Sequence, residues 1–238
     1  MFALLDLVRL GANDAQSLTR SHGLWMAWNL VLALIPFGLA LVLFPLGGRS
    51  VAAVPASRWA RVVRRSTYGF GVVLFVLFLP NAPYVLTDVI HLFDDIRQSR
   101  SDLQILGVYL PVYLAFFGIG IAAYGASLHR VWRWVEPRRS VRVALGVEVG
   151  LHLLVALGVY LGRVLRLNSW HVFTRPRVVL GTLDALAGPF PIAMILISAL
   201  TLAAVSLFWR VGDAGVRSLF GAGHLRAGRP RTVTPMPL

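Results

Sequence analysis

The stretch PFPIAMILISALTLAAVSLFW, residues Pro189–Trp209, decides the fold of this chain. It contains no charged residue, and a helix needs about 20 predominantly apolar residues to cross the roughly 30 Å hydrocarbon core of a membrane. A helix on the surface of a soluble protein is apolar on one face only, whereas this stretch is apolar almost all round. It therefore predicts a transmembrane helix.

The rest of the chain has the same character. Of its 238 residues 57% are hydrophobic and 14% charged, and the mean hydropathy is +0.72. A soluble domain carries about 25% charged residues, so a 26.1 kDa globule of this composition could not cover its apolar surface. The absence of cysteine excludes disulfide scaffolds, thiol catalysis and iron–sulfur clusters. We expect an all-α, polytopic transmembrane helix bundle of about five spans, the other four lying near Leu24–Leu46, Ser66–Tyr84, Leu103–Leu128 and Val141–Leu161.

The second span contains a break. Only 14 residues separate Ser66 from Leu79, about 21 Å of helix, before Pro80 and Pro83 interrupt the pattern. Asn81 is placed to cap a new helix, with Pro83 in its first turn. We expect the second span to be broken at Pro80 and Pro83, with the segment from Leu79 to Asp95 forming a loop outside the membrane.

The two ends of the chain differ from its middle. Residues 1–10, MFALLDLVRL, are too short to cross a membrane and contain Asp6 and Arg9, which is typical of an interfacial helix. The last residues are rich in glycine, proline and arginine, which favours disorder. We expect an N-terminal interfacial segment (1–22), a transmembrane domain (23–212) and a disordered C-terminal tail (213–238).

All 23 basic residues are arginines, and the net charge is +13. Such a charge can indicate nucleic-acid binding, but these arginines lie in short segments between apolar blocks, as in a membrane topology signal. The segments after the first, third and fifth spans carry 15 arginines and the alternate segments carry 8. The positive-inside rule then predicts an N-terminus outside and a C-terminus in the cytoplasm, with membrane lipid and not nucleic acid as the partner.

Polar residues concentrate in two places. After the break, Tyr84, Asp88, His91 and Asp95 repeat at helical spacing on one face, opposite an apolar face. In the fourth span, the polar residues Glu148, His152, Arg163 and Arg166 fall within about 60° of one another at 100° per residue. The other side of this span carries Gly146, Gly150, Gly158 and Gly162, which is typical of close helix packing. We expect Glu148 and His152 to pair, and Asp88, Asp95 and Asp184 are the partners available to the two arginines.

Three segments carry a family resemblance: WNLVLALIP (Trp28–Pro36), LPNAPYVLTDVIHL (Leu79–Leu92) and YLGRVLRLNSWHVFTRP (Tyr160–Pro176). They resemble a family of bacterial integral membrane proteins known as domain of unknown function 1361, over roughly Trp28–Trp209. The resemblance implies a multi-pass protein of the bacterial inner membrane and no particular activity. The family pattern has aspartate after NSW where this chain has His171, which argues against a role that needs a carboxylate there.

Several chemistries fit these residues. Asp88, His91, Glu148 and His152 are candidates for general acid–base catalysis. Asp88, His91 and His152, with His171, could ligate a divalent metal, although no tight motif such as HExxH is present. The alternative is that Glu148–His152 and Asp88–Arg163 are structural pairs that satisfy buried polar groups. The candidates for ligand binding are Asn81, Tyr84, Arg163, Arg166, Asn168 and Trp170.

Three functions remain open from the sequence. The first is an outward-facing polar pocket that uses Asp88/His91, Glu148/His152 and Arg163/Arg166 to bind an anionic lipid head group or envelope intermediate. The second is a small ion-coupled transporter or channel subunit, since a broken span and an intramembrane Glu148–His152 pair occur in transporters. The third is a structural or assembly protein without a catalytic site, working with another membrane protein or as a homo-oligomer. Whether the chain is an enzyme stays open, as does its cofactor.

Overall fold

The computed structural model describes residues 22–46, 57–99, 101–166, 174–182 and 184–226. Throughout these ranges the regular secondary structure is helical and no strand occurs, so the all-α prediction is confirmed. The predicted interfacial segment lies almost entirely outside the described residues. The last helix continues to Arg226, past residue 213, where we expected a disordered tail to begin, and residues 227–238 lie outside the described ranges.

Five helical segments among the described residues are long and apolar enough to cross a membrane, as the sequence predicts. The chain is therefore a multi-pass membrane protein. The spans are Leu24–Leu43, Arg58–Gln98, Asp102–Arg138, Val141–Arg163 and Pro189–Gly215. The longer helices are α2 (Leu24–Leu43), α3 (Arg58–Phe78), α5 (Val89–Gln98), α7 (Leu110–Val135), α8 (Val141–Arg163) and α11 (Pro189–Arg226), and the short ones are α4 (Asn81–Tyr84), η2 (Val85–Asp88), α6 (Asp102–Gln104), η3 (Ile105–Tyr109), η4 (Glu136–Arg138), α10 (Pro176–Gly181) and η5 (Asp184–Ala187).

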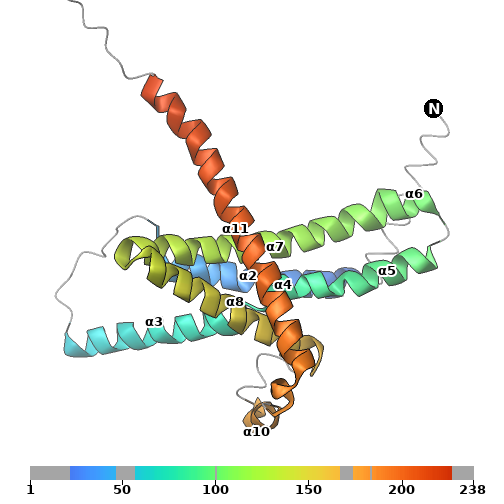
Figure 1. The fold of residues 1–238 in the computed structure, drawn as a ribbon, viewed down its shortest axis with the longest axis horizontal. Helices are drawn as coiled ribbons and strands as arrows, with labels where there is room; N and C mark the ends of the chain where they lie inside the picture. Colours follow the sequence, from blue (N-terminus) through green and yellow to red (C-terminus); the bar gives the residue numbers. More distant parts are fainter. Residues whose placement is uncertain (1–21, 47–56, 100, 167–173, 183, 227–238) are drawn as a thin grey trace, which may run out of the picture.

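The helices form a bundle around α2 and α7 (Figure 1). Helix α2 packs against α7 over most of its length and also contacts α3 and α4. Helix α8 packs mainly against α11, and in Figure 1 α11 crosses in front of α7 and α8 at a steep angle. The neighbours of α8 change along its length: its last turns face the region of α4 and η2, while its middle faces α11.

The break in the second span is tighter than predicted. Only Leu79 and Pro80 leave the helix, and α4, η2 and α5 then follow without a loop up to Gln98. The new helix expected after Pro80 is therefore confirmed, and it follows α3 more directly than a loop from Leu79 to Asp95 would. Pro83 lies in the first turn of α4, as expected, where its missing N–H has little cost.

The prediction that Asn81 caps α4 was wrong, because Asn81 belongs to the first turn of this helix. Its side-chain Nδ2 donates a hydrogen bond to the Phe78 carbonyl oxygen at 3.0 Å, so it satisfies the end of α3 instead. The Thr87 hydroxyl donates to the Tyr84 carbonyl oxygen at 2.6 Å in the same way. Side chains thus satisfy two backbone carbonyl oxygens around the break, which suits a polar backbone inside an apolar bundle.

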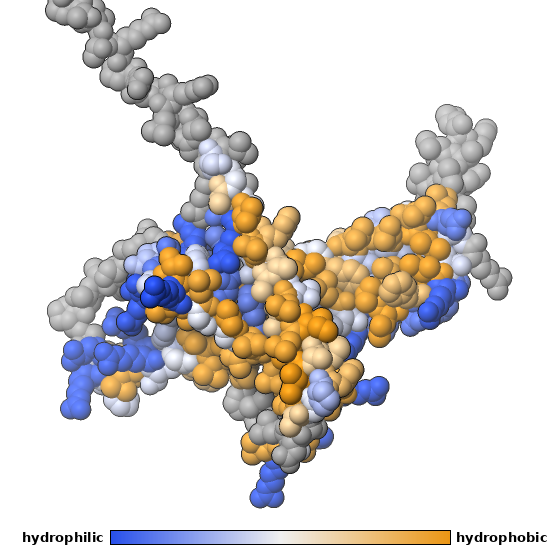
Figure 2. Space-filling model, in the orientation of Figure 1, coloured by the Kyte–Doolittle hydropathy of each residue, from blue (hydrophilic) through white to orange (hydrophobic). Residues whose placement is uncertain are grey.

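The outer surface of the bundle is apolar. Figure 2 shows hydrophobic residues along α11 and along the arm that α5 and α7 form. Phe208 is 80% exposed and Leu200 is 70% exposed, and both lie on α11. Apolar patches of this extent mark contact with lipid or a partner protein, and here they continue over several helices. By contrast, Tyr113 and Tyr124 of α7 are fully buried and form the centre of the core.

Candidate functional site

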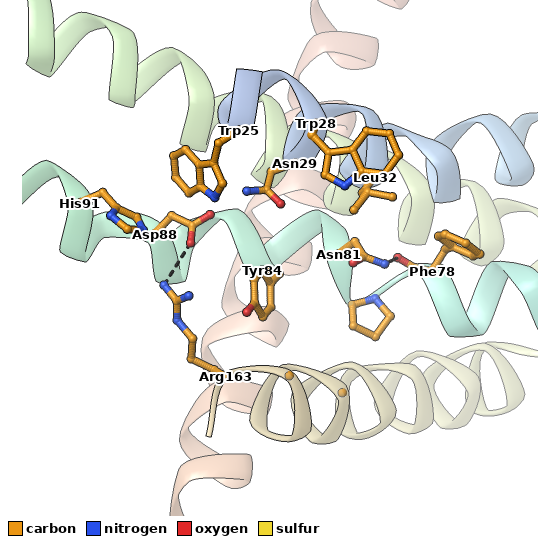
Figure 3. A pocket seen from close by; sticks show the side chains of 13 residues that line it. Trp25, Trp28, Asn29, Leu32, Phe78, Asn81, Tyr84, Asp88, His91 and Arg163 are labelled. Carbon is orange, nitrogen blue, oxygen red and sulfur yellow. Dashed lines mark hydrogen bonds and ion pairs between the residues drawn. The ribbon is translucent and has the colours of Figure 1, made fainter. Parts of the chain in front are cut away.

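A cavity of about 310 Å³ lies where α2, the segment from α3 to α5, and the end of α8 meet (Figure 3). Sites for small molecules are typically concave, with mostly apolar or aromatic walls and a few convergent polar groups, and this cavity fits that pattern. Its polar and aromatic lining side chains are Trp25, Trp28, Asn29, Phe78, Asn81, Tyr84, Asp88, His91 and Arg163.

Asp88 is the most buried charged group at this cavity, with 2% of its surface exposed. Its Oδ1 lies 3.0 Å from Nη2 of Arg163, and the same nitrogen donates to the Thr87 carbonyl oxygen. Its Oδ2 has no hydrogen-bond partner among the residues that the structure describes. In Figure 3 this second oxygen points away from Arg163, toward the side where Trp25 lies. A buried acceptor without a partner is costly, so it marks a position where a ligand or water would donate.

Aromatic rings form the walls of the cavity. The ring centroids of Trp25 and His91 lie 4.7 Å apart in an edge-to-face arrangement. The guanidinium carbon of Arg163 lies 5.3 Å from the centroid of the Tyr84 ring, within the range of a cation–π interaction. The helical spacing of Tyr84, Asp88 and His91 thus brings all three to one cavity, as the sequence predicts, although Asp95 pairs with His22 at 3.2 Å and with Tyr113 at 2.8 Å.

The floor of the cavity depends on a glycine. A Cβ added to Gly158 of α8 would lie 2.6 Å from Cγ of Pro80, so only glycine allows α8 to approach the break in the second span. Gly162, one turn later, also lines the cavity. A Cβ on Gly146 or Gly150 would meet nothing within 4 Å. The predicted small-residue contact face of the fourth span therefore exists at Gly158 and was wrong at Gly146 and Gly150.

A second hollow adjoins the cavity and shares Arg163 with it. It encloses about 610 Å³ and is lined by Tyr84, Ile90, Gly162, Arg163 and Arg166. Arg166 follows the end of α8 with a φ of 53°, a left-handed conformation that non-glycine residues seldom adopt. It has no hydrogen bond or ion pair with any residue that the structure describes. This hollow thus brings two arginines together, and none of its described lining residues is acidic.

Glu148 and His152 form a separate cluster between α8, α7 and α11. Glu148 Oε1 accepts a hydrogen bond from the Ser206 hydroxyl at 2.6 Å, and its Oε2 lies 3.1 Å from Nη1 of Arg210. His152 Nε2 lies 3.8 Å from Glu148 Oε1, which confirms the expected pair, and its Nδ1 is 2.7 Å from the Tyr124 hydroxyl oxygen. The cluster therefore uses both oxygens of its carboxylate.

The structure does not bring the predicted pocket residues into one site. Asp88, His91 and Arg163 share the cavity, Arg166 lines the adjoining hollow, and Glu148 and His152 belong to the other cluster. The sequence pattern placed the polar residues of α8 on one seam, but the neighbours of α8 change along its length. The further candidates Asn168, Trp170 and His171 lie outside the described residues, as does the side chain of Asp184.

The metal hypothesis gains no support from the geometry. Within the described parts of the chain, no group of three or more His, Asp or Glu side chains is placed to hold a metal ion. Asp88 and His91 are at the cavity, while His152 is in the other cluster with Tyr124 and Ser206. General acid–base catalysis by these residues stays a prediction.

Several important residues were missed from the sequence. Trp25, Trp28 and Asn29 of α2 supply one wall of the cavity, and Ser206 and Arg210 of α11 complete the Glu148 cluster. The available signal was weak: Asn29 is polar within an apolar block, and Arg210 is the first charged residue after the fifth span. Each of these residues lies on a different helix from the residues that it joins, so only the packing of the helices identifies it.

Residues 28–204 match a protein family described as "Protein of unknown function (DUF1361)". No curated protein and no solved structure matches the chain. The matched range includes most of the cavity lining and all of Glu148, His152, Arg163 and Arg166, whereas Trp25, Ser206 and Arg210 lie just beyond it. Since the match covers most of the chain, the chain belongs to this family.

Proposed function

We propose that this member of the DUF1361 family binds an anionic group, from a lipid head group or an envelope intermediate, with Arg163 and Arg166. The observation that carries the proposal is the hollow lined by both arginines, with no acidic residue among its described lining. Arg166 has no partner among the described residues, so its donors are available to a ligand. Guanidinium groups bind phosphate and carboxylate through paired hydrogen bonds, which suits such a ligand.

The balance of charge supports the same ligand class. Asp88 compensates one arginine of the site, at 3.0 Å, and leaves the charge of the other uncompensated. An anion carrying one negative charge would neutralise the remainder. A membrane protein meets such groups at the head-group level of the bilayer, where anionic lipids are attracted by clustered basic residues.

The binding test uses purified protein in detergent and dioctanoyl phosphatidylglycerol as the probe, followed by isothermal titration calorimetry. Arg166→Ala is expected to weaken binding at least about tenfold, because one charge-assisted hydrogen bond contributes roughly 1.5–3 kcal/mol. The thermal midpoint should not change, since Arg166 contacts no described residue through a hydrogen bond or ion pair.

Two variants serve as controls for this titration. Arg97→Ala removes an exposed arginine of α5 that is not part of the hollow, so it should bind as tightly as the wild type. Arg166→Lys should retain part of the affinity, because it keeps the charge and loses the forked geometry. Equal binding by wild type and Arg166→Ala would overturn the proposal.

We also propose that the protein resides in a bacterial inner membrane with its N-terminus outside and its C-terminus in the cytoplasm, so that the cavity opens outward. The arginine distribution supports this orientation. The chain has no cysteine, so a single Asp94→Cys variant is a specific probe. Asp94 is exposed on α5, and a membrane-impermeant thiol reagent should label it on intact cells. Labelling only after permeabilisation would show the opposite orientation.

A further inference from the structure

The cavity beside the two arginines contains a group that an anion alone would not use. Asp88 is 98% buried, and its Oδ2 has no partner among the described residues while its Oδ1 is paired with Arg163. A carboxylate oxygen accepts hydrogen bonds and would repel a bare phosphate. The ligand that binds the arginines should therefore also carry a hydrogen-bond donor that reaches Asp88.

The donor can be a hydroxyl or an ammonium group, and the charge of the site favours the hydroxyl. Arg163 and Arg166 supply two positive charges and Asp88 one negative charge, which a phosphodiester balances completely. A hydroxyl leaves this balance intact, whereas an ammonium group would add a positive charge that the described residues of the site do not compensate.

The remaining polar groups of the cavity also suit several hydroxyls. Asn29 offers both a donor and an acceptor, and its side chain makes no hydrogen bond to any residue that the structure describes. Asn81 uses its Nδ2 on Phe78, which leaves its Oδ1 as an acceptor. Trp25 and Trp28 supply apolar ring faces against which the C–H groups of a polyol can pack. A volume of about 310 Å³ is at the lower end for small-molecule sites, so it fits a single head group.

We infer that the ligand is the phosphate ester of a polyol or sugar, an inference that rests on the proposed function. Its phosphate binds Arg163 and Arg166, and one of its hydroxyls donates a hydrogen bond to Asp88 Oδ2. Asp88 is then the residue that determines specificity, while the arginines supply affinity for the phosphate.

The experiment compares two lipids that differ only in the hydroxyls. Dioctanoyl phosphatidylglycerol and dioctanoyl phosphatidylpropanol have the same charge and the same acyl chains, and only the first has free head-group hydroxyls. The wild type should bind the phosphatidylglycerol at least about tenfold more tightly, because a hydrogen bond to a charged group is lost with the other lipid. Dioctanoyl phosphatidylethanolamine should bind no better than phosphatidylpropanol.

The variant Asp88→Asn tests the assigned residue. Asparagine can still accept a hydrogen bond from Arg163, but it places an NH₂ donor where Oδ2 was. We expect the ratio of the two affinities to fall to near one, while phosphatidylpropanol binds at least as tightly as before, because the loss of the Asp88 charge leaves both arginines uncompensated. Asp94→Asn is the matched control, since Asp94 is exposed on α5 and does not line the cavity, and it should keep the wild-type ratio.

The outcomes separate this inference from the proposed function. Equal binding of the two lipids by the wild type, still dependent on Arg166, would overturn the hydroxyl assignment and leave the anion site intact. Preference for phosphatidylethanolamine would overturn it in favour of an ammonium group. The comparison of lipids on the wild type decides this even if Asp88→Asn does not fold. A last titration with sn-glycerol 1-phosphate identifies the source: binding comparable to that of the lipid indicates a soluble ester, and much weaker binding indicates a lipid.

Discussion

Two clusters in this protein place a carboxylate beside an arginine among apolar helices, and they differ in what the carboxylate does with its second oxygen. Glu148 uses both oxygens, one with Ser206 and one with Arg210. Asp88 uses one oxygen with Arg163 and leaves the other at a cavity. Charged groups within a membrane protein are costly, so each needs a reason to be kept. Glu148 joins α8 to α11, whereas the second oxygen of Asp88 is the one that we propose accepts a hydrogen bond from a ligand.

The difference gives a way to separate structural from functional charges. Substitution in the Glu148 cluster should lower stability and leave the binding of phosphatidylglycerol by the folded protein unaltered. Substitution of Asp88 by asparagine should remove the preference of the folded protein for phosphatidylglycerol over phosphatidylpropanol. The distinction fails if substitutions at Glu148 and at Asp88 have the same effects on stability and on lipid binding.

The largest effect on stability is expected for Glu148→Leu. It removes the partner of Arg210, Ser206 and His152 at once and leaves a partly buried guanidinium without its carboxylate. Breaking a buried pair in this way costs about 3 kcal/mol. The measurement is the thermal midpoint in detergent together with the amount of protein in the membrane, and both should fall.

Two further variants sharpen this result. Glu148→Gln can still accept a bond from Ser206, so its loss should be smaller. The double variant Glu148→Leu/Arg210→Leu removes both charges, and it should recover much of the stability because an apolar pair replaces the ion pair. A Glu148→Leu protein with wild-type stability would show that the cluster does not hold α8 to α11, and the contrast with Asp88 would be lost.

The sequence predicts the spans well because each is a long apolar block, and length and hydropathy need no tertiary information. The Asp88–Arg163 pair was expected among several alternatives, and the structure confirms it at 3.0 Å. The helical spacing of Tyr84, Asp88 and His91 likewise predicts their shared face. These features depend on local periodicity or on opposite charges near the ends of spans.

What the sequence does not predict depends on which helices meet. Ser206 lies 58 residues from Glu148 in the chain, and nothing in either segment indicates that they touch. The same holds for Trp25 of α2, which lies against His91 of α5. The sequence predicts a new helix after Pro80 but not how closely it follows α3, because the side-chain bonds of Asn81 and Thr87 to backbone carbonyl oxygens are not indicated by two prolines alone.

A smaller effect on stability is expected at Gly158, the glycine that lets α8 approach the break in the second span and so bring Arg163 to Asp88. Gly158→Ala places a methyl group 2.6 Å from Cγ and 2.9 Å from Cβ of Pro80. A proline ring cannot rotate away, so α8 must move from the break in the second span at a cost of about 1–3 kcal/mol. Arg163 lies on the same helix just beyond the contact, so the movement should also weaken the binding of phosphatidylglycerol several-fold.

Gly150→Ala is the matched control on the same helix, since its added methyl group meets nothing within 4 Å. Alanine has a higher helix propensity than glycine by about 1 kcal/mol, so this variant should be as stable as the wild type or slightly more stable. Thermal midpoints and titrations on both variants complete the comparison. If Gly158→Ala lost stability but bound the lipid normally, the contact with Pro80 would serve folding alone and the position of Arg163 would be set elsewhere. If it lost both, the close approach at Gly158 is what holds the arginine against Asp88.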